Sequence, residues 1–244
     1  MLFDYYELRA RIVPATIVAA PTVLPPLAHE VRAAGGWMWT SVAATTLLAA
    51  VYALSFVVRF LGKKLEPRLW NSWGGPPSTL VLAQNDSVFP ATTKQLIYEA
   101  VRHETQFVID PVEAASEDWR QLTSEAFRLV RQYLRRRDPK GIWYAHNAEY
   151  GMLRNLYGGT PVMATFATIS LVWCGIVAWD ERTSLTVFLV AIAALALLLA
   201  LVARRYLLPE LLRAAAVQYA ESAWSCFLAS TTGSNVPREN GGAP

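Results

Sequence analysis

The sequence predicts a mainly α-helical membrane protein, with four transmembrane spans and a mostly helical domain inserted between the second and third spans. Three observations predict this class: long stretches without charged residues, Lys and Arg gathered on one side of those stretches, and helical spacing of apolar residues between them. The 244-residue chain is 54% hydrophobic, with a formal net charge of +3. Its mean hydropathy of +0.26 agrees with a membrane protein.

Four stretches contain no Asp, Glu, Lys, Arg or His: Ile12–Ala28, Trp37–Val58, Pro161–Trp179 and Ser184–Ala203. About 20 helical residues cross the ~30 Å hydrocarbon core of a bilayer, and a helix bonds its own backbone groups internally. We therefore predict a span at each stretch, against the alternative of a buried helix in a soluble domain. Four prolines lie in the first stretch: Pro14, Pro21, Pro25 and Pro26. That stretch is expected either to span with a kink or to re-enter.

The charges flanking these stretches predict the orientation, because Lys and Arg remain on the cytoplasmic side. One side of the predicted spans carries Arg9, Arg11, Arg59, Lys63, Lys64, Arg68, Lys140, Arg154, Arg204 and Arg205. The short loops on the other side carry only Arg32 and Arg182. Both termini and the long central segment are therefore expected in the cytoplasm. The N-terminus, MLFDYYELRAR, does not resemble a cleavable signal.

The predicted organisation has five parts: membrane regions at 1–60 and 161–205, a cytoplasmic sensing domain at 61–160, a cytoplasmic helix at 206–230 and a disordered tail at 231–244. Within the domain, Gly74–Pro77 predicts a turn and Ser78–Ala83 a short strand. Thr92 with Gln95 predicts a helix start by a capping box.

Two further helices are predicted in the domain. Ser116 is expected to cap a helix that ends near Arg137, because Asp138-Pro139 disfavours helical backbone. A last helix, Ile142–Tyr157, is expected to lead into the third span. After the fourth span, Pro209 predicts a kink or a helix start.

The sequence offers little catalytic chemistry. Phosphate-binding loops, zinc-protease motifs and nucleophile elbows are absent from it, and its histidines are far apart. Cys174 and Cys226 have no pairing or metal-binding spacing, so both are expected to be reduced and apolar in character. We therefore predict a non-enzymatic protein with no cofactor and no metal.

The strongest basic feature is a cluster of six residues: Arg128, Arg131, Arg135, Arg136, Arg137 and Lys140. The first three are spaced by three and four residues and share one helix face. Guanidinium groups in such a row can grip phosphates in bidentate fashion. The cluster is therefore a candidate ligand site, and the alternatives are a solvated face or contact with anionic lipid.

A second candidate lies at the entry to the third span. Asn147, Tyr150, Gly151 and Arg154 share one face of a helix. They predict either a structural joint with a close helix contact or, through Arg154, a further ligand contact. Hydroxyl residues in the second span, Thr40, Thr45 and Thr46, are candidates to line a pore between several subunits. The alternative is that each hydroxyl bonds a carbonyl of its own helix.

Two segments resemble a family of small bacterial membrane effectors of antiphage defence, such as that of the Hailong system. They are Trp70–Thr79, which resembles the pattern WDxxGGxPT, and Asn147–Asn155, which resembles the pattern ENxxYGxxRN. His146 stands where the second pattern has an acidic residue. The resemblance implies a channel in the bacterial inner membrane, controlled by a single-stranded oligonucleotide, with a nucleotidyltransferase as a partner.

These observations lead to a hypothesis and an alternative. The hypothesis is a homo-oligomer, such as a tetramer, that forms a channel gated by a nucleotide or oligonucleotide bound to the basic cluster. The alternative is a non-conducting anchor or scaffold in the lipid bilayer that docks a cytoplasmic protein.

Overall fold

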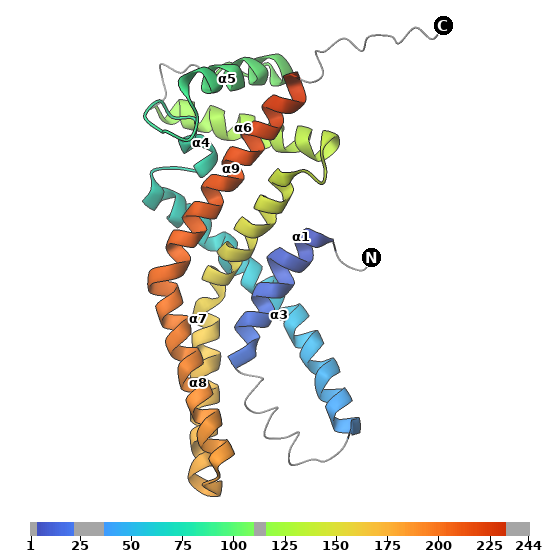
Figure 1. Ribbon diagram of the computed structural model, residues 1–244, viewed down its shortest axis with the longest axis vertical. Helices are drawn as coiled ribbons and strands as arrows, with labels where there is room; N and C mark the ends of the chain where they lie inside the picture. The colour runs from blue at the N-terminus through green and yellow to red at the C-terminus, as the bar shows by residue number, and fades with distance from the viewer. Residues whose placement is uncertain (1–3, 22–36, 110–115, 233–244) are drawn as a thin grey trace, which may run out of the picture. The chain divides into compact units, whose positions relative to one another are not determined.

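The computed structural model describes residues 4–21, 37–109 and 116–232, and every regular element among them is helical (Figure 1). The elements are α1 Tyr5–Glu7, η1 Leu8–Ile12, a helix over 13–21, α3 Trp37–Trp73, α4 Pro77–Leu80, α5 Ala91–Thr105, α6 Glu117–Arg137, α7 Ile142–Glu181, α8 Ser184–Val202, η3 Ala203–Leu207 and α9 Leu208–Thr232. The two η elements are short π-helical turns. The predicted helical class is confirmed.

Among the described residues, three helices are long and apolar enough to cross a membrane. They are Ala44–Leu80, Ile142–Glu181 and Ser184–Thr232. The second and third contain the predicted spans Pro161–Trp179 and Ser184–Ala203, and the first contains the predicted span Trp37–Val58 from Ala44 onward. The other predicted span, Ile12–Ala28, is helical as far as residue 21, and its remainder lies outside the described residues.

The chain divides into two units. The first, here called the membrane unit, comprises Met1–Glu66 and Ala148–Ala214, and the second, here called the helical unit, comprises Pro67–Asn147 and Ala215–Pro244. Helices α3, α7 and α9 contribute residues to both units. The membrane unit therefore extends along α7 well before Pro161, where the sequence analysis began the second membrane region.

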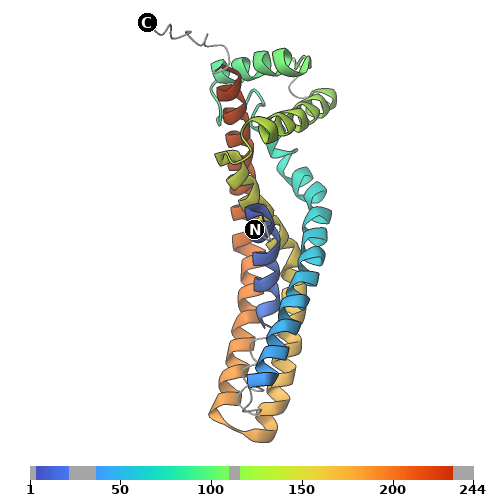
Figure 2. The same cartoon turned by 90° about the vertical axis from the view of Figure 1, so that its right-hand side faces the viewer.

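Glycines on α7 bring the helices of the membrane unit into backbone contact. A Cβ atom added at Gly158 would lie 2.4 Å from the backbone nitrogen of Gly62 on α3. At Gly151 it would lie 3.1 Å from Cβ of Ala10, in the π turn near the N-terminus. Small residues of this kind allow helices to approach closely where lipid gives no hydrophobic drive for packing. Figure 2 shows the N-terminal helix beside α3 and α7.

Helices α7 and α8 lie side by side as a hairpin in both views (Figures 1 and 2). Thr183 caps α8 by accepting a bond from the backbone N–H of Thr186 at 3.3 Å. The buried positions of α8 are Thr186, Leu189, Ala193 and Ala200, a narrow stripe at helical spacing. Large apolar side chains on its other faces, including Phe188, Leu195 and Leu198, are exposed. Such a surface suits contact with lipid.

Prolines explain the two π turns. In η1, Val13 donates to the carbonyl of Leu8, five residues back, and Pro14 follows directly. In η3, Leu208 donates to the carbonyl of Ala203 in the same way, and Pro209 follows. A proline has no N–H to continue the α-helical bonds, so each helix passes through a wider turn before it.

The helical unit has an aromatic core between α6 and α9. Phe127 lies 5.3 Å from Trp224 and 5.8 Å from Tyr219, between ring centroids, and Tyr133 lies 5.4 Å from Phe227. The indole N–H of Trp224 donates to the carbonyl of Ser78 in α4 at 2.9 Å. The two edge-on ring pairs and the tilted Phe127–Trp224 pair hold α9 against α6 within this unit.

Two local predictions are wrong. The predicted strand at Ser78–Ala83 is instead the short helix α4, because Pro77 at its first turn presets the helical φ angle. The predicted capping box at Thr92 and Gln95 is also absent, because the N-cap of α5 is Pro90, two residues earlier, and it makes no side-chain cap.

Candidate functional site

Helix α6 carries most of the candidate residues, and its sequence explains its ends. The hydroxyl of Ser116 accepts a bond from the backbone N–H of Trp119 at 3.1 Å, as predicted for an N-cap. Glu117 and Asp118 occupy the first turn, and three arginines occupy the last. Acidic residues at the start of a helix and basic residues at its end both stabilise it, because they interact favourably with the helix dipole. The dipole alone thus accounts for some of the basic charge at this end.

The six basic residues divide into two groups on the structure. Arg128 and Arg135 are exposed on one face of α6, and Arg131 is half-buried between them. The guanidinium carbon of Arg131 lies 5.5 Å from the centroid of the Phe127 ring. The predicted shared face therefore exists, and we call Arg128, Arg131 and Arg135 the arginine ladder.

Arg136 and Arg137 line a hollow of about 470 Å³ to which the ladder residues do not contribute. Its other walls are Leu129, Gln132 and Tyr133 on α6, and Glu104 and Thr105 at the end of α5. Arg137 stacks over Tyr133 at 5.9 Å from the ring centroid. Lys140 is exposed in the turn after α6. A single rigid ligand contacting one face would therefore miss part of the predicted cluster.

The basic residues have no acidic partners. Over the described ranges 4–21, 37–109 and 116–232, no ion pair within 4.0 Å involves any of the six. On the same helix, Arg120 does have such a partner, Glu117 at 3.9 Å. The basic residues of α6 and of the turn after it therefore form no ion pair with the described acidic residues, although Glu104 lines the same hollow as Arg136 and Arg137.

Arg154, the remaining candidate for ligand binding, belongs to the membrane unit. Its side chain donates to the Glu66 carboxylate at 2.7 Å and to the side-chain amide oxygen of Asn155 at 3.2 Å, and the residue is only 6% exposed. Tyr150 donates to the same Glu66 carboxylate at 2.9 Å. Because its donors are occupied inside the protein, we remove Arg154 from the ligand site and assign it to the structural joint.

The candidate pore residues lie on α3. Thr45 and Thr46 are exposed, away from the buried side of that helix, and the hydroxyl of Thr45 donates to the carbonyl of Ser41 at 3.0 Å. The side chain of Thr40 lies outside the described residues. Because both side chains are exposed on the surface of the described helix, a pore lined by them would be formed between subunits.

Two residues of structural importance, Glu66 and Lys94, are not among those predicted from the sequence. Glu66 lies 88 positions before its partner Arg154, and the sequence contains no signal that pairs them. Lys94 is buried and lines a cavity next to α5. The sequence around it predicted only the start of a helix. Its position on the same face as the apolar Ile97, Tyr98 and Val101 was the available clue.

No known family model, curated protein or solved structure matches the chain. The described residues contain no group of three or more His, Cys, Asp or Glu placed to hold a metal ion. Inference about function therefore depends on the chain's own charges and packing.

Proposed function

We propose that this protein is the subunit of an oligomeric membrane effector, a ligand-gated channel controlled by a nucleotide or oligonucleotide signal in antiphage defence. The observation that carries the proposal is the arginine ladder, whose guanidinium groups lack acidic partners among the described residues. Guanidinium groups in a row along a helix suit successive phosphates of a polyanion. The resemblance of Trp70–Thr79 and Asn147–Asn155 to defence effectors supports the same ligand class.

Shared helices support a link between ligand and membrane. Helix α7 runs without interruption from Ile142 to Glu181, and α8 continues through η3 into α9. A ligand that binds one state of the helical unit better than another would shift the population of the membrane unit through these helices. Gating then needs only a difference in affinity between two states.

The first experiment measures binding of a labelled single-stranded oligonucleotide to the purified full chain by fluorescence anisotropy. Each phosphate contact releases counterions, so affinity should fall steeply between about 50 and 200 mM salt. The double variant R128E/R135E should bind at least ~100-fold more weakly, since each lost charged hydrogen bond costs on the order of 1.5–3 kcal/mol. Arg131 remains unchanged because it packs over Phe127.

The matched control is Arg120→Glu, which reverses one charge on the same helix outside the ladder. It should retain the wild-type oligonucleotide affinity. If R128E/R135E also retains that affinity, the ladder is not the ligand site. Weaker sedimentation of that variant with anionic vesicles, at unchanged oligonucleotide affinity, would assign the ladder to lipid headgroups instead.

A further inference from the structure

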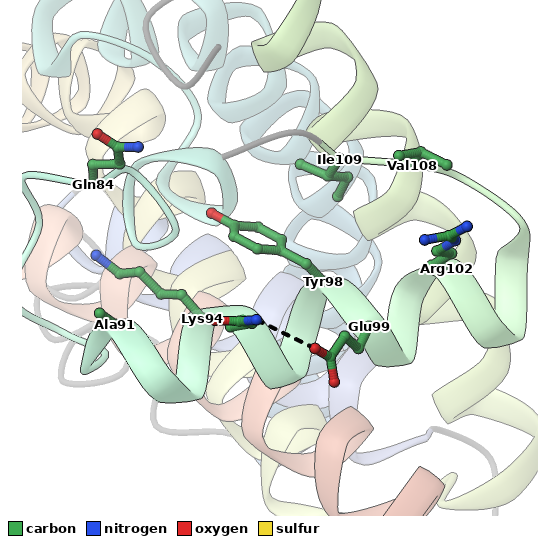
Figure 3. A pocket seen from close by; sticks show the side chains of 9 residues that line it. Gln84, Ala91, Lys94, Tyr98, Glu99, Arg102, Val108 and Ile109 are labelled. Atoms are coloured by element: carbon green, nitrogen blue, oxygen red, sulfur yellow. Dashed lines mark hydrogen bonds between the residues drawn. The ribbon is translucent and has the colours of Figure 1, made fainter. Parts of the chain in front are cut away.

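A cavity of about 590 Å³ lies along α5 in the helical unit (Figure 3). Its walls include Gln84, Lys94, Tyr98, Glu99, Arg102 and Ile109. A volume of this size is typical of sites that hold small organic molecules. The cavity is lined by residues other than the arginine ladder, so it would be a separate site.

Lys94 is the unusual residue of this cavity, because its charge is buried and pairs with none of the described acidic side chains. The residue is 6% exposed. Its ammonium group donates to the backbone carbonyls of Ala83 and Asp86, the second at 2.7 Å. Throughout the described part of the chain, no carboxylate lies within 4.0 Å of it. An ammonium has three N–H donors, and two of them are used by these carbonyls. One donor and the positive charge therefore remain available to a ligand.

The contrast with Arg154 shows what is missing at Lys94. Both residues are 6% exposed, but Glu66 neutralises Arg154 at 2.7 Å. A buried charge without a counter-charge is costly. An anion entering the cavity would remove that cost, whereas a neutral molecule would not.

The rest of the cavity indicates the shape of the ligand. In Figure 3 the Tyr98 side chain lies between Lys94 and Arg102. The hydroxyl of Tyr98 is held by the carbonyl of Leu82 at 2.7 Å, so the ring keeps a fixed position. Arg102 lies about 12 Å from Lys94 along the helix, from a rise of about 1.5 Å per residue. An aromatic body could therefore lie along Tyr98 with its anionic group at Lys94.

We propose that this cavity binds a small organic anion, with its phosphate or carboxylate at Lys94 and a planar body beside Tyr98. The ligand's anionic group takes the position beside the ammonium that a carboxylate side chain would otherwise fill, and its planar body lies against the cavity wall that includes Tyr98. The site is independent of the arginine ladder and of the proposed polyanion.

Isothermal titration of the purified full chain with AMP, adenosine and benzoate tests this proposal. AMP or benzoate should bind, and adenosine, which lacks the anionic group, should bind at least ~10-fold more weakly than AMP. Binding of AMP alone identifies phosphate as the anion, and binding of benzoate alone identifies carboxylate. Failure of both anions to bind overturns the proposal.

Variants locate the binding. Lys94→Met should weaken the affinity for the anion about 10- to 100-fold. This substitution also removes two hydrogen bonds to the loop at 83–86. Val108→Trp therefore serves as a second variant, since it fills the cavity from its exposed rim and leaves Lys94 intact. This variant should also fail to bind the anion. Unchanged affinity in either variant overturns the proposal. The control R128E/R135E should bind the anion with the wild-type affinity.

Discussion

Asn155 shows how a single side chain compensates for a proline in another helix. Its amide donates to the carbonyl of Ala10 at 2.6 Å. In an α-helix that carbonyl would accept the N–H four residues on, but Pro14 occupies the position and has none. Pro161 leaves the carbonyl of Tyr157 without its helical partner in the same way, and Arg204 donates to it at 3.2 Å.

Replacing Asn155 by Ala should therefore destabilise the protein by about 1–3 kcal/mol, the cost of an unpaired buried polar group. The measurement is the free energy of unfolding in detergent. In a Pro14→Ala background the restored N–H can serve the Ala10 carbonyl, so Asn155→Ala should cost less. Equal costs in the two backgrounds would mean that this hydrogen bond does not stabilise the joint.

Tyr98 gives a prediction about alkaline stability. Burial raises its pKa to about 12, whereas an unfolded tyrosine ionises near pH 10. Above about pH 10 the unfolded chain loses this proton and the folded chain keeps it, so the folded state loses stability between about pH 10 and 12. The stability advantage of the wild type over Tyr98→Phe should shrink across that range. A constant difference in melting temperature would contradict it.

For single residues, the sequence predicts features that depend on neighbouring positions in one helix. Spacing alone placed Arg128, Arg131 and Arg135 on one helix face. It could not show that Arg131 packs over a ring, nor that Arg154 meets Glu66, because both depend on tertiary packing. Arg154 therefore belongs to the structural joint and not to the ligand site, because it bonds Glu66 and Asn155.

At the scale of elements, a helix end could be predicted where a particular residue starts or stops the helix. Ser116 begins α6 and Asp138 follows its last residue, as expected. The predicted strand at Ser78–Ala83 is wrong because apolar residues over so short a run fit a buried helix equally well. The start of α5 was displaced because Pro90 took the capping position from Thr92.

The crossing of α3 and α7 predicts opposite effects for two glycines of one helix. On propensity alone, glycine to alanine stabilises a helix by about 1 kcal/mol. At Gly158, however, a Cβ would lie 2.4 Å from the Gly62 nitrogen. Gly158→Ala should therefore lower the melting temperature measured in detergent.

The matched control is Gly175→Ala in the same helix, where a Cβ meets no atom within 4 Å. This variant should melt at or above the wild-type temperature. If both variants raise the melting temperature, α3 and α7 do not hold the close crossing described here.

At the scale of the whole molecule, the placement of basic residues predicts the topology. Reporters inserted near Asp110 and fused after Pro244 should both report cytoplasm, and a reporter at Gly35 should report the opposite side. The reason is the excess of Lys and Arg beside the predicted spans. A reporter signal from the far side at Asp110 would reverse the assignment of the helical unit.

We propose that an anionic ligand on α6 controls ion flow through the membrane unit. Ion current across a planar bilayer containing the purified protein tests it most directly, with and without a single-stranded oligonucleotide. The wild type should conduct, and its current should change when the oligonucleotide is added on the side of α6. R128E/R135E should conduct without responding. No current under either condition would contradict the channel and leave the membrane anchor as the function.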